Sequence, residues 1–310
     1  MSLNILFSAS NERWSEYKDA LHTAFAASGV SAHLSTEIAE SEVDYIIYAP
    51  NGPVSDFSIF PQLKAVLGLW AGVETVVDNP TLKVPMSRMV DSGLREGMVE
   101  WVTGHVLRYH LGMDAHITGQ NGVWKPEYPP LARHRKVGIL GMGALGSACA
   151  KTLATLNFQV CGWSRTPKEI AGVNCYSGEP GLEEVLAQSE ILVLLLPLTQ
   201  ATENILNTRR LAMMPKGAKL LNPGRGALID DDAMLEALNA GHIGHATLDT
   251  FRVEPLPADH PYWTHKRVTV TPHLASETRA DTSAEVIAEN IRRFEAGEEM
   301  SFVVDRVAGY

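Results

Sequence analysis

The chain has 310 residues, about two domains at the usual size of roughly 100–200 residues each, and its 45% hydrophobic and 20% charged residues exclude wholesale disorder. Lys and Arg number 26 against 36 Asp and Glu, and a net charge of −10 argues against a nucleic-acid partner, which needs a dense basic face. The longest apolar run, residues 191–196, is far shorter than the roughly 20 residues that cross a bilayer, so no membrane partner is expected.

Short apolar runs alternate with helical patterns along the first half of the chain, which is typical of βα units and a parallel sheet. The predicted strands are residues 3–8, 43–49, 65–70 and, more weakly, 84–90. Helices are predicted over residues 12–28 and from about residue 95 to beyond residue 109. Residues 119–130 contain Gly, Asn and three prolines, which predicts a loop or arm.

The second half repeats the alternation more regularly. The predicted strands are residues 136–140, 158–163, 191–196, 219–222, 245–250 and 268–271. Helices are predicted over residues 144–156, 230–240 and 276–296, before a short apolar run at 302–304. Residues 191–196 are so apolar that we expect them to form a central strand covered on both faces.

These patterns predict an α/β protein with two doubly wound, Rossmann-like parallel-sheet domains. We expect a nucleotide-binding domain at residues 99–277, inserted into a substrate domain made of residues 1–98 and 278–310. The first ten residues lack the basic flank and apolar core of a secretory signal. The three cysteines, Cys149, Cys161 and Cys175, are an odd set without zinc-ligand spacing, so we expect a reducing, cytoplasmic setting and no metal.

A glycine-rich segment directly follows one predicted strand and opens a predicted helix. Dinucleotide-binding loops need Gly141 for a tight turn, Gly143 for close approach of the pyrophosphate and Gly146 for helix–strand packing. The helix N-terminus then offers N–H groups and a partial positive charge to the phosphates. The predicted cofactor contacts in this loop are Gly141, Met142, Gly143, Ala144, Leu145 and Gly146. We therefore predict dinucleotide binding here.

The end of the next predicted strand indicates which cofactor binds. A carboxylate about 20 residues beyond the glycines would hold a ribose 2′-hydroxyl and mark NAD. Here Ser164 stands at that position, and Arg165, Thr166 and Lys168 follow without a carboxylate among them. Hydroxyls beside a guanidinium suit a phosphate dianion, so we predict NADP, with NADPH preferred over NADH.

Three polar residues follow predicted strands, on the edge where open α/β sheets bind ligands. They are Arg225, Glu254 in a proline-rich turn, and His273. Each alone has an ordinary structural explanation, and a single histidine becomes catalytic only through its surroundings. His105 and His110 are five residues apart on a predicted helix, which does not bring two imidazoles onto one face for a metal.

Together, these motifs resemble the D-isomer-specific 2-hydroxyacid dehydrogenases from about residue 67 to residue 310. The matching segments are residues 68–73, 141–146, 195–199, 222–226, 248–251 with 254–257, and 271–273. Residues 91–93, 162–165, 304–306 and 309–310 look like the glyoxylate/hydroxypyruvate reductase A branch. The chain departs from its relatives at Gly224, where alanine is common before the arginine, and at Thr250, where valine is usual.

The resemblance implies NADPH-dependent reduction of small 2-keto acids, glyoxylate and hydroxypyruvate first, to 2-hydroxy acids. It implies that His273 donates the proton, that Glu254 orients the imidazole and that Arg225 binds the keto acid. Substrate-binding N–H groups are implied at Gly72 and Val73, and further cofactor contacts at Leu196, Pro197 and Asp249. Asp249 would hold the nicotinamide carboxamide.

Two alternatives remain open at this point. A non-catalytic NAD(P)-binding regulator can share this fold, and a dehydrogenase of another substrate, such as phosphoglycerate, would need further basic groups that the sequence does not locate. Because the family is usually dimeric, we expect a homodimer, with the long helix and the arm at residues 119–130 as its interface.

Overall fold

The computed structural model describes residues 2–310; Met1, the first residue of the predicted substrate domain, lies outside the described residues. The chain forms two compact units. Unit 1 consists of residues 2–94 with Glu277–Tyr310, and unit 2 consists of Arg95–Ser276. Unit 2 is thus inserted into unit 1, with boundaries at residues 95 and 277 where the sequence suggested 99 and 278.

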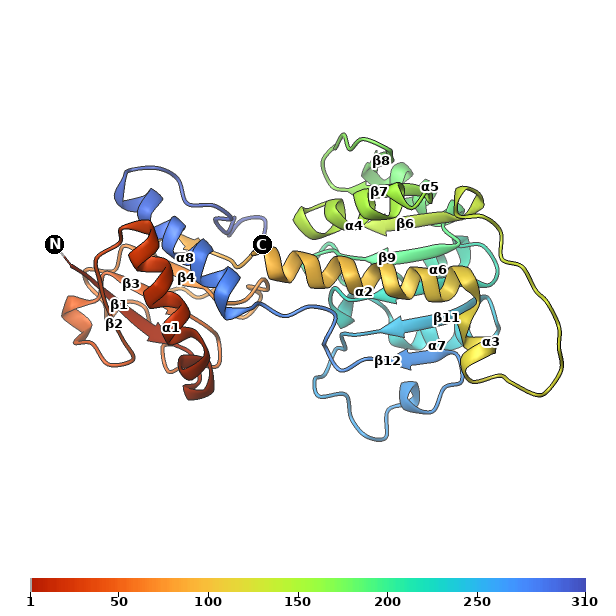
Figure 1. Ribbon diagram of the computed structural model, residues 1–310, viewed down its shortest axis with the longest axis horizontal. Helices are drawn as coiled ribbons and strands as arrows, with labels where there is room; N and C mark the ends of the chain where they lie inside the picture. Colours follow the sequence, from red (N-terminus) through yellow and green to blue (C-terminus); the bar gives the residue numbers. More distant parts are fainter. Residues whose placement is uncertain (1) are drawn as a thin grey trace. The chain divides into compact units, whose positions relative to one another are not determined.

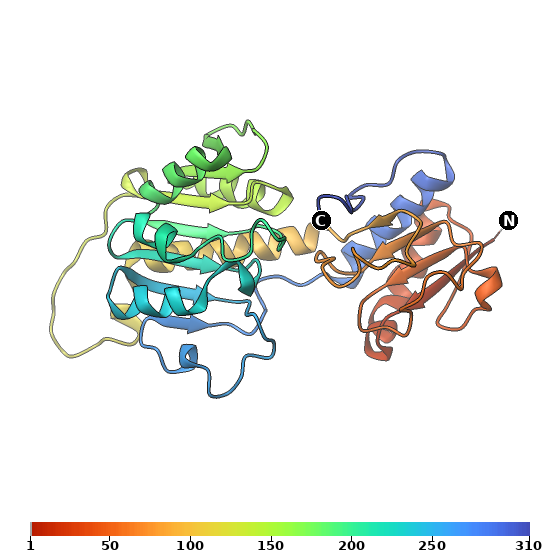
Figure 2. The ribbon, with the colours of Figure 1, turned by 180° about the vertical axis from the view of Figure 1, so that it is seen from behind.

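Unit 1 contains a five-stranded, all-parallel sheet in the order β2-β1-β3-β4-β5. Its strands are β1 (Leu3–Ser8), β2 (Ala32–Ser35), β3 (Tyr45–Tyr48), β4 (Ala65–Gly68) and β5 (Met86–Ser87). Helices α1 (Asn11–Ser28) and α8 (Ala280–Glu295) pack together on one face (Figure 1). Loop residues such as Phe57, Val76 and Leu82 cover the other face, which Figure 2 shows from behind.

Helix α8 packs where it does because its apolar residues recur every three or four positions. Ala284, Ile287, Ala288 and Ile291 are all buried against the core that contains Phe7 and Leu21. The helix begins at Ala280, four residues later than residue 276 where the pattern predicted it, and the backbone of Arg279 is still extended.

Unit 2 contains a seven-stranded, all-parallel sheet in the order β12-β11-β10-β9-β6-β7-β8. Its strands are β6 (Lys136–Leu140), β7 (Gln159–Ser164), β8 (Val173–Ser177), β9 (Ile191–Leu194), β10 (Ala218–Asn222), β11 (Ile243–Leu248) and β12 (Val268–Val270). This is the doubly wound order of dinucleotide-binding domains, and its switch point lies between β6 and β9. The predicted fold class is confirmed.

Helices cover both faces of this sheet (Figures 1 and 2). They are α2 (Ser92–Leu111, which starts in unit 1), α3 (Met113–Ile117), α4 (Ala144–Thr155), α5 (Gly178–Gln188), α6 (Thr208–Met213) and α7 (Asp231–Asn239). One core lies under α2 and α4, and the other under α5, α6 and α7. The central strand β9 sends Ile191 and Val193 into the first core and Leu192 and Leu194 into the second, as its apolar sequence predicts.

Within residues 2–310, every helix is too short or too polar to span a bilayer.

Candidate active site

The glycine loop lies at the carboxyl end of β6. Gly141 has φ +105°, and a Cβ there would lie 2.4 Å from the carbonyl oxygen of Leu195. A Cβ at Gly146 would lie 1.8 Å from the carbonyl oxygen of Gly141. At Gly143, by contrast, a Cβ would meet no atom within 4 Å. Packing within the protein therefore requires glycine at 141 and 146, whereas the space over Gly143 is open to a ligand.

Helix α4 begins directly after this open position. Gly143 is its N-cap and offers no side-chain hydrogen bond, so the first-turn N–H groups, those of Ala144 and Leu145 included, retain the partial positive charge of the helix end. Met142 is almost fully buried, and its side chain packs against Gly162 of β7. The loop therefore has the donors and the space that a diphosphate requires.

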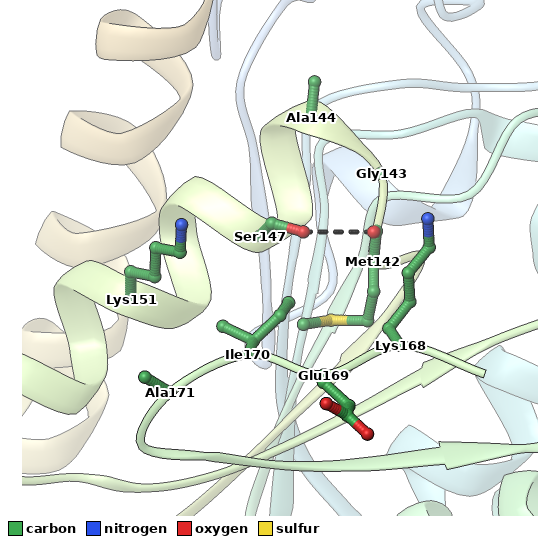
Figure 3. A pocket seen from close by; sticks show the side chains of 9 residues that line it. All are labelled: Met142, Gly143, Ala144, Ser147, Lys151, Lys168, Glu169, Ile170 and Ala171. Carbon is green, nitrogen blue, oxygen red and sulfur yellow. Dashed lines mark hydrogen bonds between the residues drawn. The ribbon is translucent and has the colours of Figure 1, made fainter.

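A surface pocket of about 470 Å³ opens beside this loop. Figure 3 shows Lys151 of α4 and Lys168 of the segment after β7 among its lining residues, with Glu169 next to Lys168. Ser147 donates a 3.0 Å hydrogen bond from its hydroxyl to the carbonyl oxygen of Met142, which ties α4 to the glycine loop. Sequence reasoning missed Lys151, because a lysine about two turns into a helix is indistinguishable from an ordinary solvated side chain.

The segment after β7 carries the predicted 2′-phosphate contacts. Ser164 donates from Oγ to the carbonyl oxygen of Thr166 over 2.7 Å, which bends the chain at the end of the strand. The side chains of Arg165, Thr166 and Lys168 are exposed. Two lysines and one arginine thus lie on this segment and on the adjoining face of α4, which favours an anionic ligand group.

Residues 195–197 follow β9, on the other side of the switch point. Leu196 is buried, Pro197 is half-buried, and the Pro197 carbonyl oxygen accepts a 2.7 Å hydrogen bond from the Thr202 hydroxyl. The Leu195 backbone lies directly against Gly141. The structure therefore places this predicted cofactor-binding segment against the glycine loop.

His273 and Glu254 form a hydrogen-bonded pair. Nδ1 of His273 lies 2.7 Å from Oε2 of Glu254, and Oε1 of Glu254 accepts a 2.8 Å hydrogen bond from the Phe251 N–H. The backbone thus fixes the carboxylate, and the carboxylate fixes the imidazole. The two side chains are 51% and 34% exposed, so a small molecule can reach them. The backbone hydrogen bond from Phe251 has no sequence signal.

Asp249 is completely buried beneath this pair. Its Oδ1 accepts from the Thr271 hydroxyl and the Leu274 N–H over 2.6 and 2.9 Å, and its Oδ2 accepts from the Ala275 N–H over 3.0 Å. The His273 N–H donates to the Asp249 carbonyl oxygen over 2.9 Å. Asp249 therefore holds the loop that carries His273, a role that sequence reasoning missed, and its contact with nicotinamide stays a prediction.

Arg225 lies in the loop after β10, and hydrogen bonds to the Asn222 side chain fix the conformation of this loop. The Asn222 side chain donates to the Arg225 carbonyl oxygen over 2.9 Å and accepts from the Gly224 N–H over 3.2 Å. A Cβ at Gly226 would lie 2.0 Å from the backbone of Phe251, so this loop packs directly on the loop that carries Glu254. Because β10, β11 and β12 are adjacent and parallel, Arg225, Glu254 and His273 share one sheet edge.

The two departures from relatives fall in this region. A Cβ at Gly224 would lie 2.9 Å from the Leu194 carbonyl oxygen, so the loop here packs closer than alanine would permit without a shift. The Thr250 hydroxyl is 3.4 Å from the Asn222 carbonyl oxygen, a long hydrogen bond between the same two loops.

Gly72 and Val73 lie in unit 1, in the loop after β4. Val73 is buried, and its carbonyl oxygen accepts from the N–H groups of Val76 and Val77 over 2.9 and 2.8 Å. Within residues 2–310, the N–H groups of Gly72 and Val73 donate to no protein acceptor. Two adjacent donors without protein partners are suited to an anion.

One other histidine, His245, and two cysteines, Cys149 and Cys161, are buried in the protein interior or hydrogen-bonded to it. His245 bonds Thr269 through Nε2 over 2.9 Å, and burial lowers its pKa to about 4. Burial also raises the pKa of the Cys149 thiol to about 12 and that of Cys161 to about 11. Among the described residues, no three His, Cys, Asp or Glu side chains gather as a metal site would require.

Known proteins resemble the whole chain. Residues 105–275 match the NAD-binding domain of the D-isomer specific 2-hydroxyacid dehydrogenases. A glyoxylate/hydroxypyruvate reductase A from Yersinia enterocolitica is 40% identical over 257 residues, which cover 80% of this chain and 82% of that protein. A D-isomer specific 2-hydroxyacid dehydrogenase from Xanthobacter autotrophicus Py2, solved with NADPH and MES, has a TM-score of 0.92 and 40% identity with all of both chains covered.

An NADPH-dependent glyoxylate/hydroxypyruvate reductase from Sinorhizobium meliloti, solved with NADP and sulfate, has a TM-score of 0.86 and 32% identity, again with all of both chains covered.

Proposed function

This chain belongs to the D-isomer-specific 2-hydroxyacid dehydrogenases, and we propose that it uses NADPH to reduce small 2-keto acids, glyoxylate and hydroxypyruvate first, to 2-hydroxy acids. The observation that carries the proposal is the 2.7 Å contact between His273 and Glu254, on the sheet edge that also bears Arg225. The fold and the glycine loop alone would serve equally for a binding protein.

The dinucleotide would be held by the N–H groups at the start of α4 and by the open backbone at Gly143, with Arg165, Lys168 and Lys151 toward its 2′-phosphate. When bound, NADPH supplies a hydride to the keto carbon. The bare space over Gly143 supports this placement, because the protein's own packing leaves that position unfilled.

His273 supplies the proton that the reduction needs. Its Nδ1 is engaged by Glu254, which leaves Nε2 to donate to the keto oxygen as the C=O bond becomes C–OH. Before the proton is transferred, the Glu254 carboxylate stabilises the positive charge of the protonated imidazole. Because the Phe251 N–H holds this carboxylate, the carboxylate also keeps the imidazole ring in place. In the reverse direction the same nitrogen accepts the proton.

Arg225 orients the keto acid. Its guanidinium can donate two parallel hydrogen bonds to the keto oxygen and the carboxylate, and it stabilises the negative charge that develops on the keto oxygen. The N–H groups of Gly72 and Val73 would bind the carboxylate, which is consistent with their lack of a protein acceptor. We propose a cytoplasmic setting from the three free cysteines.

Cofactor oxidation tests the proposal directly. Purified protein mixed with NADPH and glyoxylate or hydroxypyruvate should consume NADPH and form glycolate or glycerate. Tight NADPH binding without turnover of either acid would favour a non-catalytic regulator. Turnover of phosphohydroxypyruvate alone would favour the phosphoglycerate alternative.

Cofactor preference is expected to depend on the segment after β7. Hydrogen bonds to a charged group contribute roughly 1.5–3 kcal/mol, so the wild-type protein should prefer NADPH over NADH by roughly 10- to 100-fold in kcat/KM. The Ser164→Asp variant should reverse the preference, because a carboxylate repels the 2′-phosphate and accepts from a 2′-hydroxyl. The measurement is kcat/KM for both cofactors at saturating glyoxylate.

The control for this variant is Ser177→Asp, which adds the same charge at the end of the neighbouring strand β8, in register with Ser164. It should shift the preference far less. A wild-type ratio at or below one would show that the basic residues of this segment do not select the cofactor.

We also propose that the protein is a homodimer in which the long helix α2 and the arm at residues 119–130 form the interface with a second copy. The arm contains no helix or strand, and Val123, Trp124 and Tyr128 are 69%, 97% and 91% exposed. Large apolar side chains grouped this way on a surface usually mark an interface.

The Trp124→Ser, Tyr128→Ser double variant should raise the dimer dissociation constant at least roughly tenfold, because each buried aromatic side chain contributes roughly 1.5–3 kcal/mol. Sedimentation equilibrium gives this constant. Val307→Ser removes a fully exposed apolar side chain from unit 1 and should leave it unchanged. A monomeric wild-type protein would refute the proposal.

A further inference from the structure

A half-buried arginine of unit 1 has no part in the chemistry described so far. Arg88 directly follows β5, at the carboxyl edge of the unit 1 sheet. Within residues 2–310, its guanidinium forms no hydrogen bond and no ion pair with the protein. Its backbone is nevertheless well fixed, because the Arg88 N–H donates to the Phe302 carbonyl oxygen over 3.0 Å.

The surroundings of this guanidinium make it energetically unfavourable to leave its positive charge unpaired. Burial lowers the pKa of Arg88 from its ordinary value, and the attraction of Tyr310 and Glu74 opposes that effect without forming a direct pair. A partly desolvated cation without protein acceptors is unfavourable unless something else supplies an anion. Perturbed groups of this kind gather at functional sites.

Arg88 is next to the loop that contains Gly72 and Val73. Strand β5 pairs in register with β4, with Leu67 opposite Ser87, and the Met89 N–H donates to the Trp70 carbonyl oxygen over 2.9 Å. The two segments therefore leave the sheet side by side, about 4.8 Å apart, the spacing of neighbouring strands. At the carboxyl edge of the unit 1 sheet, Arg88 therefore follows β5, whereas the N–H groups of Gly72 and Val73 follow the neighbouring strand β4.

The offset between Arg88 and the N–H groups of Gly72 and Val73 suits a three-carbon keto acid, which carries groups at both of its ends. The carboxylate at carbon 1 and any group at carbon 3 lie on opposite sides of the keto carbon, so a second anion-binding or hydroxyl-binding group must be offset from the first. Glyoxylate has no carbon 3 and pyruvate has only a methyl group there. Hydroxypyruvate has a hydroxyl, and ketomalonate has a second carboxylate.

We propose that Arg88 is a specificity-determining residue that binds the hydroxyl or carboxylate at carbon 3 of the 2-keto acid, while Gly72 and Val73 bind carbon 1. The inference rests on the proposed function and extends it. It makes hydroxypyruvate and 2-keto dicarboxylates better substrates than pyruvate, because only they offer acceptors to this guanidinium.

The test compares kcat/KM for glyoxylate, pyruvate, hydroxypyruvate and ketomalonate in the wild type and in Arg88→Met, with NADPH saturating. The variant should lose roughly 10- to 100-fold toward hydroxypyruvate and ketomalonate, the usual effect of a lost hydrogen bond to a charged group. Its kcat/KM for glyoxylate and pyruvate should change by less than about threefold on the same scale. Arg88→Lys should retain part of the selectivity, since it keeps the charge and loses the planar fork.

Thermal unfolding separates specificity from structure. Because the Arg88 guanidinium has no protein partner, Arg88→Met should keep or raise Tm. Arg306→Met is the matched control, since Arg306 of unit 1 donates to the carbonyl oxygens of Val77 and Asn79 over 2.9 and 2.8 Å and also to that of Leu82. It should lower Tm and leave the substrate ratios unchanged.

Two negative results can be distinguished. An equal loss for all four acids in Arg88→Met, with the wild type active, would overturn the inference and leave the proposed function intact. A wild type that reduces none of the four acids would overturn the proposed function, and the inference with it. If Arg88→Met fails to fold, unchanged substrate ratios in Arg88→Lys and Arg88→Gln would overturn the inference.

Discussion

Replacing His273 with alanine should lower kcat for glyoxylate reduction by roughly 10²- to 10⁴-fold, the range expected when a positioned acid–base group is removed. Two hydrogen bonds position His273: its ring bonds the Glu254 carboxylate, and its backbone N–H donates to the Asp249 carbonyl oxygen. Affinity for NADPH should remain close to that of the wild type. Rapid-reaction measurement of NADPH oxidation at saturating substrate gives the rate, and fluorescence titration gives the affinity.

His33→Ala is a suitable control, because His33 is exposed on strand β2 of unit 1. Glu254→Gln should retain part of the activity and lower kcat less than His273→Ala does, because the amide can still hydrogen-bond the imidazole but no longer carries a negative charge. A His273→Ala variant with wild-type kcat would remove this residue from proton transfer. Wild-type kcat in Glu254→Gln would remove Glu254 from its supporting role.

Arg225→Lys should lower kcat/KM for glyoxylate by roughly 10²- to 10³-fold, comparable to the loss of a donor that stabilises developing negative charge. The substitution keeps the charge but loses the planar pair of parallel donors, so it is not conservative at a site that binds a carboxylate and a carbonyl together. Steady-state kinetics over a range of glyoxylate concentrations, with NADPH saturating, measures the effect.

The NADPH dissociation constant distinguishes the two possible roles of Arg225. It should be unchanged in Arg225→Lys if the residue binds substrate. A large loss of NADPH affinity in a folded variant would place the guanidinium at the cofactor. Arg209→Lys, which alters an exposed arginine of α6 that pairs with Glu183, should change neither quantity.

The parts of the site that could be predicted from sequence are those that follow from strand order. In an all-parallel sheet, the residues after every strand reach the same edge, so Arg225, Glu254 and His273 could be grouped once three consecutive strands were identified. The apolar run of β9 likewise indicated the centre of the sheet. The positions of these residues therefore required no knowledge of side-chain contacts.

Strands β2 and β8 and helix α5 were not predicted from the sequence, because they lack a regular spacing of apolar residues. Strand β8 reads Val-Asn-Cys-Tyr-Ser at the sheet edge, and helix α5 has Gly178, Pro180 and Gly181 in its first turn, so neither shows a clear apolar period. Strand β2 is also at an edge and has four residues. The predicted strand at residues 84–90 is shorter in the structure, Met86–Ser87, where it pairs with β4 on one side and forms a single antiparallel bridge from Ser87 to Val303.

The contacts that hold the site together could not be predicted, because they join backbone to side chain over distance. The three hydrogen bonds to Asp249 come from residues 271–275, and the anchor of Glu254 is a backbone N–H. An aspartate after a strand has the same appearance whether it binds a ligand or supports a loop.

The insertion of one unit into the other has a consequence for how the protein is made. Helix α8 covers the apolar face of α1 and β1. The ribosome must add more than 250 further residues after α1 ends at Ser28 before it reaches α8 at Ala280 (280 − 28 = 252). Unit 2 is continuous in sequence and has its own cores, so it can fold while the first 94 residues still lack their cover. Synthesis at roughly 5–20 residues per second leaves that face exposed for roughly 10–50 seconds, and nascent chains should therefore engage chaperones through residues 2–94.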